Sequence, residues 1–138
     1  MNAGIRALAD LLEQDQRFKF EAYQFVRESL SYAHDVLQLG DHPYSESEES
    51  SAPRHLTGQQ LCEACRRHAL EQYGFLARLV LNVWGIYSTS DLGEIVYNLI
   101  RIEQMRKSDS DRREDFDDVF DFDTAFEPEF ESLFAERA

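Results

Sequence analysis

The chain has 138 residues, enough for one domain with its own core, and 43% of them are hydrophobic. Its 10 Phe, 6 Tyr and 1 Trp exclude a disordered chain. Because the formal net charge is −13, most of the surface is expected to repel nucleic acid and anionic membranes. The most apolar stretch, residues 75–87, is too short to span a bilayer, and no signal peptide is evident. These features predict a cytoplasmic protein with a single domain over residues 1–138.

The negative charge is concentrated in two segments. Residues 41–51 carry four acidic groups and no basic one, and residues 108–138 carry twelve acidic groups against three basic ones. Residues 52–107 have a net charge of +2, and residues 1–40 have a net charge of −2. The acidity therefore belongs to a linker and a C-terminal segment, and the rest of the chain is nearly neutral.

Two helices are predicted in the first forty residues. Apolar residues recur at helical spacing within residues 3–16 and 20–39, and Gly40 is a suitable C-terminal stop. Residues 41–53, which are rich in Ser, Glu and Pro, predict a poorly ordered linker. Its serines lie among acids and leave phosphorylation open, although a plain solvated connection is favoured.

Three more helices are predicted after the linker. Thr57 and Gln60 have the spacing of a capping box, which predicts a helix from there to Tyr73. Residues 75–84 are apolar on nearly every side, which predicts a central helix. Residues 90–105 again have helical spacing and follow several side chains that can cap a helix.

The acidic C-terminal segment, residues 108–138, also contains many Phe residues. Four of them, from Phe122 to Phe134, are spaced by four positions, but Pro128 interrupts a continuous helix. We expect short helical turns wrapped around the outside of a compact all-α bundle of about five helices. The alternation of Phe and Asp near residues 120–122 leaves open a short β pair, as in a winged helix.

Cys62 and Cys65 form a C-x-x-C pair, a spacing that can bind zinc or carry out redox chemistry. No second pair of ligands is evident, and on a helix both thiols fall on the apolar side. We therefore expect them to pack in the core, and we predict no metal and no cofactor. Glu63 or Glu71 could serve sterically as a carboxylate partner of His68, but this is true of most His residues on helices. His68 is therefore expected to be structural or to lie at the surface. Without a catalytic constellation, the sequence predicts no enzymatic activity.

Residues 75–84, the turn that follows and the next helix have the lengths of a helix-turn-helix. The chemistry argues against DNA reading, because the second helix begins with Ser90 and Asp91 and continues to Glu94. These carboxylates would meet phosphates of like charge. A nucleic-acid-associated regulator, masked by its acidic tail, stays as the alternative hypothesis.

The candidate interaction surface combines local positive charge with the aromatic residues of the tail. In this acidic chain, exposed arginines are candidates to receive the acidic segment. The tail aromatics would instead anchor in a partner's groove, while the acids steer toward a basic surface. We favour a third arrangement, in which the Phe side chains fold back onto their own helices, because large apolar groups are costly to expose. The candidate residues are Arg66, Arg67, Arg78, Phe122, Phe126, Phe130 and Phe134.

Several segments resemble a family of uncharacterised, conserved hypothetical proteins from planctomycetes and verrucomicrobia. The resemblance is carried by HLTGQQLCEACRRHALEQYG (55–74), LNVWGIYSTSDLGEIVYNLI (81–100), REDFDDVFDF (113–122) and TAFE, and more weakly by EAYQFVRESLSY (21–32). The family typically has Phe where Leu92 stands. The resemblance implies a bacterial source and an acidic Phe-rich stretch that belongs to the domain. It implies no activity, substrate or catalytic residue.

Taken together, these patterns predict a non-catalytic protein–protein interaction or regulatory module. Its expected partner is another protein with a basic surface, or a second copy of the chain in a homo-oligomer. Nucleic acid is a weaker candidate because of the charge, and no membrane segment is predicted.

Overall fold

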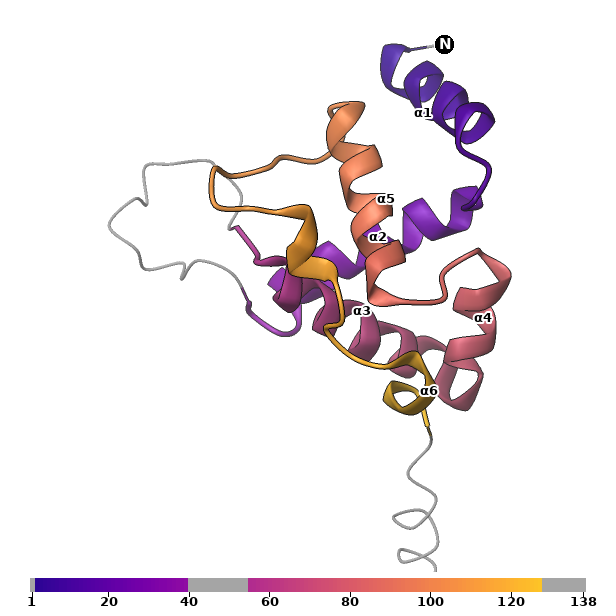
Figure 1. Cartoon of the computed structure of the whole chain (residues 1–138), viewed down its shortest axis with the longest axis vertical. Coiled ribbons are helices and arrows are strands. Elements are labelled where there is room, and N and C mark those ends of the chain that lie inside the picture. Colours follow the sequence, from indigo (N-terminus) through magenta and orange to yellow (C-terminus); the bar gives the residue numbers. More distant parts are fainter. Residues whose placement is uncertain (1, 40–54, 128–138) are drawn as a thin grey trace, which may run out of the picture.

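A computed structural model describes residues 2–39 and 55–127 of the chain. The predicted linker over residues 41–53, together with Phe130 and Phe134, lies outside the described residues. The elements within them form a compact all-α bundle (Figure 1), which confirms the predicted fold class. In chain order they are α1 Ala3–Gln14, α2 Phe20–Asp35, α3 Gly58–Tyr73, η1 Gly74–Leu76, α4 Ala77–Val83, α5 Thr89–Arg101, η2 Arg113–Phe116 and α6 Phe122–Ala125, where η marks a short 3₁₀ helix.

Side-chain caps define where three of the helices begin. The side chain of Asn2 caps α1, and that of Ser88 caps α5. The capping box predicted for α3 is confirmed, because the Gln60 amide donates to the Thr57 hydroxyl and the Thr57 amide donates to the Gln60 side chain, both at 3.0 Å. Each cap satisfies an N–H group that has no partner within the first turn of the helix.

Two helices end earlier than predicted. The α2 helix ends at Asp35, and Gln38, three residues further on, has a φ of 54°. The α5 helix ends at Arg101, and Glu103 has a φ of 62°. Glycine is the residue that usually adopts positive φ, so these helix ends carry no obvious signal in the sequence.

The core lies between α2, α3 and α5. The α2 and α3 helices share the most extensive contact in the bundle, and α5 packs against both of them. The inner side of α5 buries Leu92, Ile95 and Leu99 almost completely. Burial of each such side chain stabilises the fold by about 1.5–3 kcal/mol. The α5 helix is therefore one of the three core helices.

The α4 helix does not lie at the centre, which corrects the prediction for this stretch. Its inner side buries Ala77 and Leu81, while Leu79 on the opposite side is exposed. Arg78 and Asn82, four positions apart, lie among these apolar residues and were the sequence signal of an outward side. An apolar composition all round a helix did not mean burial all round it.

The described part of the acidic C-terminal segment, residues 108–127, packs on the outside of the bundle, as predicted (Figure 1). In η2, the ring of Phe116 lies against α3 and α5, where Gly58 and Gly93 leave room for it. A Cβ on Gly93 would lie 2.6 Å from the Cβ of Phe116, so a larger residue would push the segment away. The side chain of Asp121 caps α6. No strand occurs in residues 55–127, so the β pair considered near residue 121 does not form.

A polar network connects the α1–α2 turn, α5 and η2. The Asp15 carboxylate accepts hydrogen bonds from Arg17 at 2.6 Å and from Asn98 at 3.0 Å. The Arg17 guanidinium, with help from Asn98, holds the pKa of Asp15 well below its usual range. Glu94 forms ion pairs with both Arg113 and Arg17, and these lower its pKa as well. The network therefore fixes the acidic segment to the core helix.

Candidate functional site

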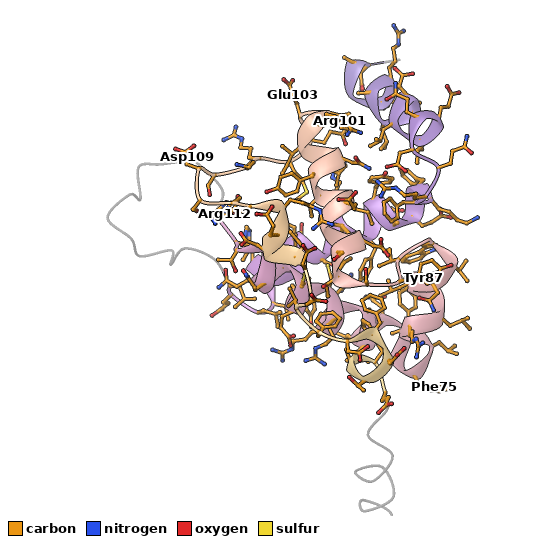
Figure 2. The ribbon with its side chains drawn as sticks, viewed as in Figure 1. Phe75, Tyr87, Arg101, Glu103, Asp109 and Arg112 are labelled. Atoms are coloured by element: carbon orange, nitrogen blue, oxygen red, sulfur yellow. The ribbon has the colours of Figure 1, made fainter. Side chains whose placement is uncertain are left out.

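A patch of large apolar side chains lies on the outer side of η1 and α4. Phe75, Leu79 and Val83 are 73%, 60% and 58% exposed, and their spacing of four residues aligns them in one stripe. Leu76 and Tyr87, 48% and 63% exposed, border this stripe. Figure 2 shows Phe75 and Tyr87 on the same side of the molecule, near opposite ends of α4. We call these five residues the α4 face. The apolar sequence of residues 75–84 predicted a central helix, so the α4 face was not predicted.

The charged groups next to the α4 face are mainly acidic. Arg78, the cation of α4, forms a 2.8 Å ion pair with Asp123 of α6. Asp121 caps the same short helix. At the other end of the face, the carboxylate of Asp91 accepts a hydrogen bond from the Tyr87 amide at 2.8 Å. The apolar stripe therefore has carboxylates near both ends, and its one arginine is already paired.

The three arginines predicted to receive the acidic segment do not form one site. Arg78 does meet this segment through Asp123. Arg66 instead pairs with Glu63, one turn away on α3, and Arg67 is exposed to solvent. Among the described residues, the contact of this group with the acidic segment is thus a single exposed ion pair. Such pairs contribute about 0–1 kcal/mol, so these three arginines are a minor part of what holds the segment.

Phe122 and Phe126 are buried in their own domain, which corrects their place on the candidate interaction surface. Their ring centroids are 4.9 Å apart, and the ring of Phe120 lies 5.7 Å from the first and 5.8 Å from the second. For these two residues the fold-back arrangement is confirmed, so neither is available to anchor in a partner's groove. Phe130 and Phe134 lie outside the described residues.

Cys62 and Cys65 are fully buried on α3, as predicted. Burial raises the pKa of both thiols, that of Cys65 to about 12, and the neighbouring thiol adds to the rise at Cys62. Within residues 2–39 and 55–127, no group of three or more His, Cys, Asp or Glu side chains could hold a metal ion. A buried thiol with a raised pKa is a poor nucleophile.

The folded protein is expected to protect both thiols from a disulfide reagent such as DTNB at about pH 8. Because the thiolate is the reacting species and both thiols are buried, we expect a reaction roughly a hundredfold slower than in the denatured chain. The absorbance of the released thionitrobenzoate measures the rate, and Cys62→Ala and Cys65→Ala variants assign it. Fast labelling of either thiol with unchanged helical circular dichroism would contradict the burial.

His68 lies between aromatic rings of the α2–α3 interface. Its ring centroid is 5.5 Å from that of Phe25, with nearly parallel planes, and 4.9 Å from that of Tyr32. The Tyr32 hydroxyl donates a hydrogen bond to Glu71 at 2.7 Å. His68 therefore packs α2 against α3, in agreement with the structural role predicted for it.

The α5 helix, the second helix of the suspected helix-turn-helix, is covered near its N-terminal end. Phe116 of η2 packs on it, and Arg113 donates to the carbonyl of Ser90 at 2.8 Å and pairs with Glu94. Asp91 and Glu94 place carboxylates where a DNA-reading helix needs hydrogen-bond donors. These contacts lend no support to nucleic-acid binding, which stays a prediction.

Fold and surface together define an all-α domain with one exposed apolar helix face. In the parts of the chain that the structure describes, no helix has the length and apolar character needed to cross a membrane. No protein-family model, curated protein or solved structure matches the chain. The resemblance to the planctomycete and verrucomicrobial family therefore stays a prediction, and function has to be inferred from the surface itself.

Proposed function

We propose that the protein is a non-catalytic interaction module that binds a partner protein through the α4 face. The proposal rests on one observation, the exposure of five large apolar side chains on a short stretch of chain. Apolar surface in water is unfavourable by roughly 25 cal/mol per Å². Contiguous apolar patches of several hundred Å² on soluble domains mark interaction sites. A partner that covers α4 would remove this surface from water.

The charges around the α4 face favour a partner with basic groups. Asp121 and Asp123 lie at one end of the face and Asp91 at the other. A second copy of the chain would bring a further net charge of −13, and like charges would oppose its approach. Lysine or arginine next to apolar anchors would instead be attracted. We therefore infer a partner segment whose apolar side chains are flanked by Lys or Arg.

The size of the α4 face suits a single helical segment. Its five side chains expose on the order of 500 Å², compared with the ~800 Å² that each partner buries in a standard complex. An amphipathic helix laid along Phe75, Leu79 and Val83 would match both the stripe and this area. Because the area is small, the complex is expected to be reversible.

A synthetic amphipathic helix of Leu and Lys is expected to shift the amide NMR signals of residues 75–87 in the full-length protein. A Leu–Glu peptide of the same length should not, because its charges repel the acidic surroundings. The Leu79→Asp variant is expected to bind the basic peptide at least tenfold more weakly, since it places a charge in the middle of the apolar stripe.

Ile5→Asp is the matched control, because Ile5 is 56% exposed on the distant helix α1. Equal loss of binding in both variants, or equal binding of the acidic and basic peptides, would contradict the proposal. Sedimentation of the free protein tests whether a second copy of the chain, and not another protein, covers the α4 face. A concentration-dependent dimer that is lost in Leu79→Asp would assign the α4 face to a second copy of the chain.

A further inference from the structure

A cavity of about 440 Å³ lies between α5, the start of α3 and the segment that leads from α5 into η2. Figure 2 labels Arg112, which lines it. Its volume is typical of small-molecule sites, which are mostly apolar with a few polar groups. None of the lining residues belongs to η1 or α4, so this site is separate from the α4 face. The apolar wall includes Leu56, Leu61, Val96, Ile100, Met105 and Phe116.

Two lining residues carry buried polar atoms that lack a hydrogen-bond partner in the described chain. They are the hydroxyl of Tyr97 and Nε2 of His34. Native proteins normally satisfy buried polar groups with hydrogen bonds, because an unpaired one is unfavourable. Burial, followed by the carboxylates of Asp111 and Asp115, raises the pKa of Tyr97. The phenol is therefore protonated at neutral pH and can donate a hydrogen bond to a ligand.

Three cations and three carboxylates line the same cavity, and the three cations are exposed to solvent. The cations that line the cavity are Arg106, Lys107 and Arg112. Within residues 2–39 and 55–127, none of these three forms a salt bridge. Two of the lining carboxylates are already engaged. Asp111 bonds to His55 at 2.8 Å, and Asp115 accepts from a backbone amide at 3.1 Å. Glu103, the third, is exposed at the rim.

We propose that this cavity binds a small amphiphilic carboxylic acid. Its apolar body would fill the space along Ile100 and Met105, and its carboxylate would accept a hydrogen bond from the Tyr97 hydroxyl. Arg106 and Lys107 have long side chains that would bring positive charge to the same carboxylate. An amine or a neutral alcohol would leave these cations without a partner. The site goes beyond the proposed interaction module, because it uses different elements and a different class of ligand.

Titration of the full-length protein with sodium octanoate, octanol and octylamine tests the class of ligand. We expect octanoate to shift the amide NMR signals of α5 and of residues 103–112, with a dissociation constant below about 1 mM. Octanol is expected to bind at least tenfold more weakly, and octylamine more weakly still. Octanol that binds as tightly as octanoate, or octylamine that binds more tightly, would overturn the carboxylic acid. No shift with octanoate would overturn the site.

Two variants with matched controls test the geometry. Met105→Trp should fill the cavity and weaken octanoate binding at least tenfold, whereas Leu79→Trp on the α4 face should not. Tyr97→Phe should weaken octanoate binding about tenfold without lowering the melting temperature, because the missing hydroxyl has no partner in the protein. Tyr87→Phe, at an exposed tyrosine, should change neither quantity. Unchanged octanoate affinity in Met105→Trp or Tyr97→Phe would overturn the placement of the ligand.

Discussion

Replacement of Gly85 by alanine is expected to lower the free energy of unfolding by about 4 kcal/mol. Gly85 has a φ of 100°, a conformation that costs a residue with a Cβ about 1–3 kcal/mol. An added Cβ would also collide with the backbone carbonyl of Arg17 and lie 3.4 Å from the Cα of Phe18. Backbone atoms cannot rotate away as the end of a side chain can, so the collision adds about 1–3 kcal/mol of strain.

Urea denaturation followed by circular dichroism measures this loss, and Gly74→Ala is the control. Gly74 also has positive φ, 54°, but no atom lies within 4 Å of a Cβ built there. Its replacement should therefore add the backbone strain alone, about 1–3 kcal/mol, without the collision. If both variants lost the same free energy, the close approach of Gly85 to the Arg17 carbonyl would not be what distinguishes this position.

The contact at Gly85 also bears on the proposed function. Next to it, the carbonyl of Trp84 accepts a hydrogen bond from the Lys19 amide at 3.1 Å. The end of α4 is therefore fixed to the α1–α2 turn by backbone contacts, which hold the exposed stripe in one orientation. A surface that is rigid before binding loses less conformational freedom when a partner arrives.

Local signals in the sequence predicted most of the helices, because each depends on only a few neighbouring residues. Thr57 and Gln60 form the predicted cap, and Cys62 and Cys65 lie on the predicted buried side of α3. The ends of α2 and α5 were less predictable, since Gln38 and Glu103, which follow these helices, adopt positive φ without being glycine.

Features that depend on tertiary packing could not be read from spacing. Arg78 and Asn82 indicate an outward side of α4, but apolar residues stand on both sides of this helix. The outward position of Leu79 therefore depends on which neighbours cover α4. The proposed ligand cavity was missed for the same reason. It brings together His34, Leu56, Tyr97 and Arg106, which come from three distant parts of the chain, and no motif joins them.

The acidic segment shows why net charge was a poor guide to its role. Nine acids lie in residues 108–127, yet the contacts that attach this stretch are mainly aromatic. Phe116, Phe122 and Phe126 are all buried, whereas Arg78 and Asp123 form an exposed ion pair. The three rings point to the core, and Arg113 of the same stretch pairs with Glu94 of α5, so this part of the tail is an outer layer of the domain.

The largest test of that conclusion is Phe116→Ala, which is expected to lower the free energy of unfolding by about 3–4 kcal/mol. The ring is nearly inaccessible to solvent, and it fits between Gly58 of α3 and Gly93 of α5. Neither glycine has a side chain that could move into the space left by the ring, so the cavity should persist in the variant. Loss of this contact should also loosen η2 and expose Cys62. This thiol lies near η2, because the charge of Arg113 acts to lower its pKa.

Phe75→Ala removes the same number of atoms from a ring that is 73% exposed, and it should change stability by less than about 0.5 kcal/mol. Urea denaturation compares the two variants, and the DTNB labelling rate of Cys62 reports local detachment of the segment at low urea. Equal stability of Phe116→Ala and Phe75→Ala would mean that the acidic segment is not part of the core. Faster labelling of Cys62 in Phe116→Ala alone would instead show that the segment shields α3. A variant without residues 108–138, made to test whether the tail masks a basic surface, would then expose the core as well.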